Sequence, residues 1–367
     1  MLFLVAKKIR IEEMSAISFI SKIGLHLLYP ISLLWEIVYR IRRFYYNLGI
    51  FKRNHFAVPI ISVGNLTFGG TGKTPFTLWL AGYLEKKKKK VMILTRGYKG
   101  KLEHSSGILR ADKKLGYNAS IFGDEPLIFT RRLQSTSVVV GKRRSENLIH
   151  YFDQILPDVV LLDDGHQHLK ISRNLNLVLF DTTMPLSRYR VAPLGYMREG
   201  FGALKDADFV ILGRCDQVTE HKRDSLKKMI LSHNGELEFA EIYYGPNGFY
   251  NYDESITMSL SEVKGKNVIA VAGVASPDSF FLTLEQLGAK LVGKKVFSDH
   301  HDFKKEEITQ IISEAEDLEA LIITTEKDIV KIRRITGHER IYFLEVKVCF
   351  LSGEDKIERL VESVISP

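Results

Sequence analysis

The main hydrophobic pattern of the chain begins at Pro59, where short apolar runs alternate with longer stretches of mixed polarity. Continuous apolar runs of this length are typical of strands buried on both faces, and helices connect such strands in parallel sheets. The predicted strands are Pro59–Val63, Val91–Thr95, Ser137–Val140, Asp158–Leu162, Leu175–Asp181 and Phe209–Leu212. This pattern predicts an α/β fold with a parallel sheet covered by helices on both faces.

A second series of elements follows a more polar region. Residues Thr219–Ile230 have the pattern of a basic helix, and His233–Gly248 is expected to be loop with short strands. Strands are then predicted at Asn267–Ala272, Lys290–Phe297 and Ala320–Thr324, with helices near Ser279–Gly288 and Lys304–Ala315. This rhythm predicts a smaller α/β unit. We divide the chain into an N-terminal segment (1–46), a larger domain (47–218) and a smaller domain (219–367).

The N-terminal segment has a different composition. Residues Ile17–Val38 are rich in Leu, Ile, Phe and Trp, although charged residues and Pro30 interrupt them. A basic and aromatic flank follows: Arg40, Arg42, Arg43, Phe44, Tyr45 and Tyr46. An apolar body with such a flank predicts a helix lying in a membrane interface, while a spanning helix needs a longer uncharged stretch. The alternatives are an ordinary helix packed on the domain behind it and a single membrane-spanning helix.

Composition narrows the class of protein. A hydrophobic fraction of 45% and a charged fraction of 26% indicate a folded protein. The formal charge of +8 and the pI of about 9.2 predict anionic partners, namely nucleic acid, nucleotide phosphates or an acidic membrane surface. Cys215 and Cys349 cannot form a disulfide framework, which favours a reducing compartment in which each is a small core residue.

A glycine-rich segment between a predicted strand and helix carries the strongest chemical signal. It contains Gly69, Gly70, Thr71, Gly72, Lys73 and Thr74, followed by Pro75. Glycines let backbone N–H groups surround phosphate oxygens, while the lysine reaches the terminal phosphates and the threonine hydroxyl binds Mg²⁺. The strict phosphate-loop pattern has glycine where this chain has Thr67. The alternative is a glycine-rich turn with a chance Lys-Thr pair.

Two carboxylates end the strand predicted at Asp158–Leu162. Asp163 and Asp164 stand where a strand of this kind delivers a carboxylate to Mg²⁺, although an ordinary acidic turn has the same sequence. His166 and His168 follow, and their spacing resembles a transition-metal site without an evident third ligand. Positioning of the substrate or of the acids is the better interpretation, with a structural role as the alternative.

Other polar groups follow predicted strand ends. Asp124 opens a predicted helix, where it is either a helix cap or a functional acid. The remaining candidates for contacts with a phosphorylated ligand are Tyr98 beside Arg96, the cluster Lys142, Arg143 and Arg144, and the pair Arg198 and Glu199. His300 lies beside Asp299, and a histidine next to a carboxylate can assist removal of a proton from an alcohol. For His300, a structural role is the alternative.

Together these motifs resemble the tetraacyldisaccharide 4'-kinase family, which phosphorylates a lipid A precursor. The matching blocks, which span nearly the whole chain, are Gly64-Asn65, Gly69–Pro75, Arg96–Tyr98, Gly123–Pro126, Asp163–His168, Pro193–Glu199, Asp299-His300 and Thr324–Asp328. Several blocks in the family's order are more specific than a phosphate loop alone. Two positions depart from the family pattern: His166 stands where Phe is common, and Leu194 where a small residue is common.

The resemblance implies a phosphate-loop domain and a smaller Rossmann-like domain, with ATP and Mg²⁺ near their cleft. It implies that Asp124 is the catalytic base, assisted by His300 or, as a fallback, His301. It assigns Lys73 to phosphate contact and catalysis, and the metal ligands to Thr74, Asp163, Asp164 and Glu199. The proposed positioning residues are Tyr98, Arg144, His168 and Arg198.

The implied reaction is transfer of a phosphoryl group from ATP to the 4'-hydroxyl of a tetraacyldisaccharide 1-phosphate. The resemblance places the enzyme on the cytoplasmic face of the bacterial inner membrane, held by its N-terminal helix on an anionic surface. We expect a monomer that does not bind nucleic acid. Two rival functions stay open: a membrane-bound ATPase that acts as a switch or motor, and a nucleic-acid-binding NTPase, which the basic pI suggests.

Overall fold

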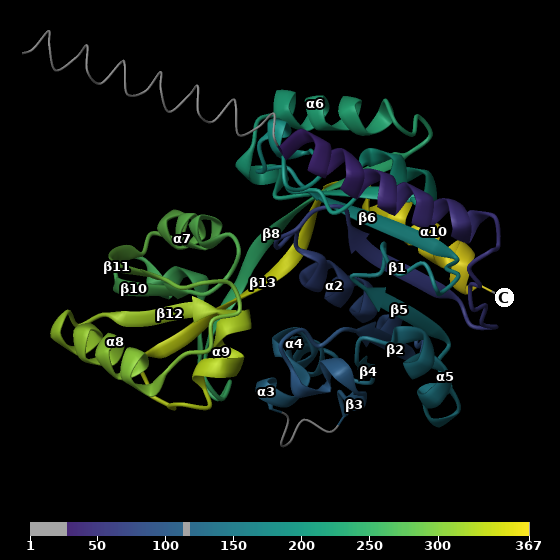
Figure 1. Cartoon of the computed structure of the whole chain (residues 1–367). Coiled ribbons are helices and arrows are strands. Elements are labelled where there is room, and N and C mark those ends of the chain that lie inside the picture. Colours follow the sequence, from purple (N-terminus) through teal and green to yellow (C-terminus); the bar gives the residue numbers. More distant parts are fainter. Residues whose placement is uncertain (1–27, 113–117, 367) are drawn as a thin grey trace, which may run out of the picture.

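The computed structural model describes residues 28–112 and 118–366, which form two lobes joined by one continuous sheet (Figure 1). This sheet has 13 strands within the described residues, and its order is β11-β10-β12-β13-β8-β7-β6-β1-β5-β2-β4-β3, with β9 paired to β8. The larger lobe contains the strands from β7 to β3 in this order. The smaller lobe contains β10, β11 and β12, and β8 and β13 cross from one lobe to the other.

The larger lobe is a parallel sheet with one antiparallel edge. Its strands are β1 (Ile60–Asn65), β2 (Val91–Thr95), β3 (Gly107–Arg110), β4 (Ser137–Val140), β5 (Val159–Asp163), β6 (Leu175–Asp181) and β7 (Phe209–Gly213). Its helices are α2 (Lys73–Lys86), α3 (Ala119–Phe122), α4 (Asp124–Arg132), α5 (Arg144–Ile155) and α6 (Glu220–Leu231). Only β3 runs antiparallel to its neighbour, β4. The six strands predicted from apolar runs are therefore confirmed within one or two residues.

Helices cover both faces of this sheet, as the unbroken apolar strands predict. Leu80 and Leu84 of α2 pack with Leu127 of α4 on one face. On the other face Leu148 of α5 packs against the neighbouring strands, and Leu226 of α6 belongs to a separate apolar cluster. The carboxyl ends of the parallel strands are thereby fixed along one edge, where loops carry the polar residues.

The smaller lobe has its own core on each side of the sheet. Its elements are β8 (Glu238–Asn251), β9 (Thr257–Met258), β10 (Asn267–Ala272), α7 (Pro277–Gln286), β11 (Lys290–Val296), α8 (Lys305–Asp317), β12 (Leu321–Thr325), α9 (Glu326–Ile332) and β13 (Ile341–Ser352). Ile308 of α8 and Ile329 of α9 pack on one face, and Leu284 of α7 packs on the other. The α/β fold class is confirmed, although one mixed sheet runs through both units.

The prediction that His233–Gly248 is mainly loop is wrong. Residues Glu238–Asn251 form the long strand β8, which pairs antiparallel with β13. The register shifts between Glu345 and Val346, so a bulge accommodates the turn-forming residues near Pro246 within the ladder. After β13 the chain returns to the larger lobe, where Ile357 and Val361 of α10 (Glu354–Ile365) join its core. Both α6 and α10 pack on the larger lobe, so the contacts do not follow the division predicted after residue 218.

Candidate active site

The glycine-rich segment forms the turn between β1 and α2, as predicted. Gly69 and Gly72 have φ values of +93° and +85°, a region that favours glycine. A Cβ atom on Gly72 would lie 1.7 Å from the hydroxyl oxygen of Tyr244, so this position also needs glycine for space. Helix α2 begins at Lys73, and its first-turn N–H groups and dipole favour an anion at this end. The segment therefore has the backbone geometry of a phosphate-binding loop.

Asp164, which follows β5, contacts the lysine of the phosphate loop. Its Oδ1 lies 3.4 Å from Nζ of Lys73, and Arg198 donates to its carboxylate at 2.9 Å. Burial opposes ionisation, but the charges of Lys73 and Arg198 outweigh it and hold the pKa of Asp164 well below its usual range. The carboxylate is therefore ionised at neutral pH and lies between two cations.

Asp163 occupies a different environment one residue away. Its carboxylate is buried and accepts hydrogen bonds from the hydroxyls of Thr95 at 2.9 Å and Thr77 at 3.5 Å. Burial, with the carboxylates of Glu125 and Asp164 nearby, raises its pKa to about 7. A bound cation would offset this repulsion, so the two acids suit a magnesium ion.

Glu199 lies apart from these acids. Its Oε2 accepts from Nε of Arg43 at 2.5 Å, and the residue is 1% exposed. Within residues 28–112 and 118–366, no group of three or more His, Cys, Asp or Glu side chains is close enough to hold a metal ion. Mg²⁺ usually binds one or two protein carboxylates and takes its other oxygen ligands from water and nucleotide phosphates.

A cavity of about 920 Å³ lies against the phosphate loop. The larger lobe contributes all of the predicted loop residues, together with Tyr98, Arg144, Asp164, His168 and Arg198. The smaller lobe contributes Ala275, Phe280, Asp299, His300 and Lys327. The site is thus a cleft between the two lobes, which combines a basic floor with apolar side chains.

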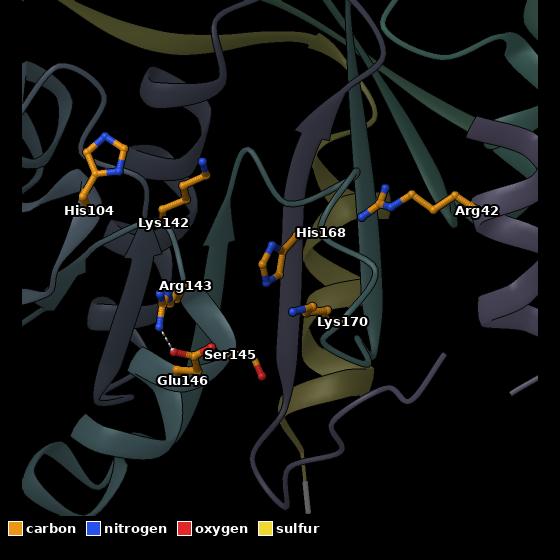
Figure 2. Close-up of a pocket in the computed structure, with 8 residues that line it drawn as sticks. All are labelled: Arg42, His104, Lys142, Arg143, Ser145, Glu146, His168 and Lys170. Carbon is orange, nitrogen blue, oxygen red and sulfur yellow. Dashed lines mark hydrogen bonds and ion pairs between the residues drawn. The ribbon is translucent and has the colours of Figure 1, made fainter. Parts of the chain in front are cut away.

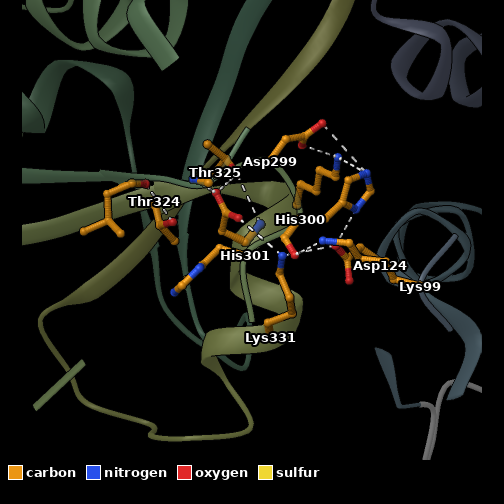
Figure 3. A network of polar contacts seen from close by, with 12 residues as sticks. Lys99, Asp124, Asp299, His300, His301, Thr324, Thr325 and Lys331 are labelled. Carbon is orange, nitrogen blue, oxygen red and sulfur yellow. Dashed lines mark hydrogen bonds and ion pairs between the residues drawn. The ribbon is translucent and has the colours of Figure 1, made fainter. Parts of the chain in front are cut away.

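Asp124 begins α4, and its carboxylate faces His300 and Lys331 of the smaller lobe (Figure 3). Asp124 is not among the residues that line the cavity. Its Oδ2 is 3.2 Å from Nδ1 of His300 and 3.1 Å from Nζ of Lys331. Burial acts to raise its pKa, but the hydrogen bond from His300 and the charge of Lys331 outweigh it and lower the pKa. The neighbouring His301 contacts Glu307 at 2.9 Å instead. Of the two histidines, His300 is the one that pairs with Asp124 and lines the cavity.

The predicted positioning residues surround the same cleft. The ring of Tyr98 lies edge-on to that of His300, with 5.0 Å between centroids. Arg144 is buried and lies 3.4 Å from the backbone oxygen of Asp163. Burial, together with Arg144 and Arg173, lowers the pKa of His168 to about 3, so its imidazole is neutral. The structure therefore brings these residues and Arg198 to one site, while their roles stay a prediction.

Comparison with known proteins decides the family. The family model described as tetraacyldisaccharide-1-P 4'-kinase matches residues 25–366. A tetraacyldisaccharide 4'-kinase of Desulfotalea psychrophila is 37% identical over 83% of this chain and 87% of its own length. One from Flavobacterium psychrophilum is 31% identical over 91% of this chain and 95% of its own length.

A solved structure agrees with these sequence matches. The crystal structure of LpxK from Aquifex aeolicus in complex with ATP superimposes with a TM-score of 0.74 at 30% identity, covering 93% of this chain and 99% of that one. The chain belongs to the tetraacyldisaccharide-1-P 4'-kinase family. The resemblance predicted from the motifs is therefore confirmed.

Three lysines contribute to this tetraacyldisaccharide-1-P 4'-kinase site, and of these the sequence motifs missed only Lys331. Lys331 contacts Asp124, while Nζ of Lys327 lies 3.0 Å from both Nε2 of His300 and Oδ1 of Asp299. Lys99 donates to the backbone oxygen of His300 at 3.2 Å. Lys327 and Lys331 are one helical turn apart on α9, so their spacing in the sequence could have indicated a shared face.

The N-terminal part of the described kinase chain is a helix over residues 28–47. Its apolar side chains are largely exposed, including Leu34 at 64%, Val38 at 55% and Phe44 at 58%. Polar contacts attach it to the larger lobe, because Trp35 donates to the backbone oxygen of Arg198 and Arg43 pairs with Glu199. No helix in residues 28–112 and 118–366 is long and apolar enough to cross a membrane. Half of the segment predicted at Ile17–Val38, residues 17–27, lies outside the described residues.

Proposed function

We propose that this chain transfers the γ-phosphoryl group of ATP to the 4'-hydroxyl of a tetraacyldisaccharide 1-phosphate. The observation that carries the proposal is a cleft in which the phosphate loop of the larger lobe faces His300 of the smaller lobe, which pairs with Asp124. Family membership and the matching ATP complex support both the donor and the acceptor. This arrangement suits direct transfer between two bound ligands.

The phosphate loop and its cations act on the donor. The backbone N–H groups of Gly69–Thr74 and the ammonium of Lys73 bind the phosphates and stabilise the charge that spreads over the transferring group. Arg198, held by Asp164 at 2.9 Å, adds a further positive charge at the cleft. Preorganised charge of this kind provides most of the catalytic effect in phosphoryl transfer.

The Asp124–His300 pair acts on the acceptor. His300 lines the cleft, and the lowered pKa of Asp124 keeps its carboxylate ionised behind the imidazole. The pair can therefore orient the 4'-hydroxyl and take its proton as the oxygen attacks phosphorus. Lys331 and Lys327 fix Asp124 and His300 at their present separation. Asp124 is the proposed catalytic base, and His300 is proposed to assist it.

Mg²⁺ is proposed to bind Thr74, Asp163 and Asp164, where it would neutralise phosphate charge. The raised pKa of buried Asp163 supports this placement, because a cation would favour its ionised form. Glu199, the fourth predicted ligand, is held by Arg43, so metal binding there requires that ion pair to open. This requirement distinguishes Glu199 from the two strand-end acids.

We further propose that the exposed apolar side chains of residues 28–47 rest in the cytoplasmic face of the bacterial inner membrane. The formal charge of +8 favours an anionic leaflet, and the lipid tails of the acceptor would remain there while its sugar enters the cleft. The acceptor and the enzyme would then meet at the same surface. The chain is proposed to act as a monomer without nucleic acid.

Acceptor dependence of ATP turnover tests the proposal. We expect ADP release by the full chain to rise strongly when tetraacyldisaccharide 1-phosphate is added in neutral micelles. Hydrolysis at one rate with and without this acceptor would favour the ATPase switch and contradict the kinase. Lys73→Ala is the control, because it removes the phosphate contact and should abolish turnover under both conditions.

A further inference from the structure

Three successive carbonyl groups of the phosphate loop accept hydrogen bonds from two side chains outside the loop. Nη2 of Arg214 donates to the backbone oxygen of Gly70 at 3.1 Å. The hydroxyl of Tyr244 donates to the backbone oxygen of Thr71 at 3.2 Å and to that of Gly72 at 3.3 Å. Neither residue belongs to the sequence motifs on which the family resemblance rests. Side chains from elsewhere in the chain therefore hold the backbone of this loop.

These contacts fix the direction of the N–H groups in the loop. A trans peptide unit is planar, so its N–H group points opposite to the C=O group of the preceding residue. The three held carbonyls therefore orient the N–H groups of Thr71, Gly72 and Lys73. Within residues 28–112 and 118–366, these N–H groups have no backbone hydrogen-bond partner. They are thus available to phosphate oxygens, which such groups bind in phosphate loops.

The two supporting side chains are themselves held in place. Arg214 follows β7 and pairs with Asp181 at the end of β6, so its guanidinium bridges that carboxylate and the loop. The same guanidinium lies over the ring of Tyr244, 5.7 Å from its centroid. Tyr244 comes from β8, and burial raises the pKa of its hydroxyl. The hydroxyl therefore stays protonated and can donate to the loop.

Glycines on two sides make room for the hydroxyl of Tyr244. A Cβ atom on Gly72 would lie 1.7 Å from the hydroxyl oxygen, and one on Gly213 would lie 3.0 Å from it. The hydroxyl thus fits closely between the phosphate loop and the end of β7. A polar group packed between two backbone segments in this way is suited to position one of them.

Two basic residues that the sequence suggested as contacts for a phosphorylated ligand lie away from the phosphate loop. Lys142 and Arg143 line a second cavity of the larger lobe, with a volume of about 380 Å³ (Figure 2). The described residues that line it include His168 of the cleft but none of Gly69–Thr74. Arg214, in contrast, lines the cleft and contacts the backbone of the loop.

We propose that Tyr244 and Arg214 are positioning residues for ATP, which act by holding the carbonyl groups of the phosphate loop. This inference rests on the proposed function, because it takes ATP as the ligand of the loop. Tyr244 would act through the N–H groups of Gly72 and Lys73, and not by contact with the nucleoside. Without these contacts the peptide units would rotate more freely, and the phosphates would bind more weakly.

Tyr244→Phe tests the first residue, because it removes the hydroxyl and keeps the ring. We expect the Kd of the full chain for ATP and for ADP to rise about three- to tenfold, since two hydrogen bonds that orient the loop are lost. The Kd for adenosine, which has no phosphate, should stay within about twofold. Tyr243→Phe is the matched control, because this neighbour on β8 points to the opposite face and does not line the cleft. It should leave all three constants unchanged.

Arg214→Lys tests the second residue. Lysine keeps the positive charge, but one ammonium does not reproduce the fork that spans Asp181 and Gly70. We therefore expect the Kd for ATP and for ADP to rise about three- to tenfold in this variant as well. If Arg214 contacted phosphate as a charge, lysine would keep nearly the wild-type affinity, and that result would overturn its positioning role.

Competition titration against labelled ATP measures these constants, and binding of tetraacyldisaccharide 1-phosphate in neutral micelles checks the rest of the cleft. Acceptor binding should be unchanged in both variants. Wild-type affinity for ATP in Tyr244→Phe would overturn the proposal. Equal losses for adenosine and ATP would overturn it as well, because they would indicate contact with the nucleoside, and so would an equal loss for the acceptor. Failure of the wild-type chain to bind ATP at all would instead contradict the proposed function.

Discussion

At the scale of single residues, the chemistry depends on neighbouring charges that give two buried carboxylates different pKa values. Asp124 and Asp163 are both buried, yet the pKa of the first is lowered and that of the second is raised. Asp124 has His300 and Lys331 as partners, whereas Asp163 has two carboxylates near it. The first is therefore suited to act as an ionised base, and the second to gain from a bound cation.

Replacement of Asp124 by Asn tests the base. The amide keeps the shape and the contact with His300 but cannot accept a proton, so kcat should fall by about 10²–10⁴-fold. The Kd for ATP should stay within about twofold, because Asp124 does not line the cleft that holds the phosphate loop. Steady-state transfer and equilibrium nucleotide binding check the two expectations. Turnover near the wild-type level would refute the role of Asp124.

Asp163 makes stability depend on pH in a defined direction. An unfolded aspartate titrates near about pH 4, whereas burial raises the pKa of folded Asp163 to about 7. Folding therefore takes up a proton within this window, and the contribution of Asp163 to stability is lost as the pH rises through it. Asp163→Asn should raise the melting temperature more at about pH 8 than at about pH 5, without Mg²⁺, while it abolishes transfer. An equal shift at both pH values would contradict this account.

At the scale of elements, α4 and α9 hold the two lobes at a fixed separation. Arg131 near the end of α4 is 9% exposed and pairs with Glu326 of α9, with Glu345 of β13 at 2.7 Å and with Glu254 at 3.2 Å. Asp124 begins the same helix and meets Lys331 of α9. Both ends of α4 thus contact the smaller lobe, so its rotation would move the base.

Breaking this buried network should be costly. Arg131→Met leaves Glu326 and Glu345 buried together without that cation, which typically lowers the free energy of unfolding by about 3–5 kcal/mol. Arg359→Met removes an exposed ion pair with Asp355 within one helix. This variant should change the free energy of unfolding by less than about 1 kcal/mol. Urea unfolding of both variants makes the comparison. Equal effects would show that the α4 network does not hold the lobes.

Local sequence patterns predicted the elements unevenly. Sequence patterns predict strands such as Val91–Thr95 and Leu175–Asp181 with their observed bounds, because each is mainly apolar and almost entirely buried. Strand β8 contains Gly245, Pro246 and Gly248, and its structure depends on pairing with β13, about 100 residues further along the chain. Such non-local pairing leaves no periodic signal in β8 itself. The same reason explains why Lys331 was missed, since its partner Asp124 belongs to the other lobe.

At the scale of the whole molecule, the exposed helix 28–47 lies at the edge of the cleft that contains the phosphate loop. Tyr39 of this helix lines the cleft. The motifs in the sequence predicted which residues bind phosphate, because phosphate loops and strand-end acids are local. The position of the helix relative to the cleft depends on the assembled lobes, so local motifs could not predict it.

The helix is expected to determine membrane binding. Replacing Leu34, Val38 and Phe44 by Ser removes three exposed apolar side chains, so partition onto anionic vesicles should fall by at least about tenfold. Leu318→Ser, at a 40% exposed leucine after α8, is the control and should have no effect. Sedimentation with vesicles measures both variants. Unchanged partition of the triple variant would place the membrane contact elsewhere.

The most direct test of the central claim is transfer of labelled phosphate from ATP to purified tetraacyldisaccharide 1-phosphate by the full chain. The account predicts a bisphosphorylated lipid with the label at position 4', formed by wild type and lost in Lys73→Ala and Asp124→Asn. Label released only as inorganic phosphate, or found at another position of the sugar, would contradict it.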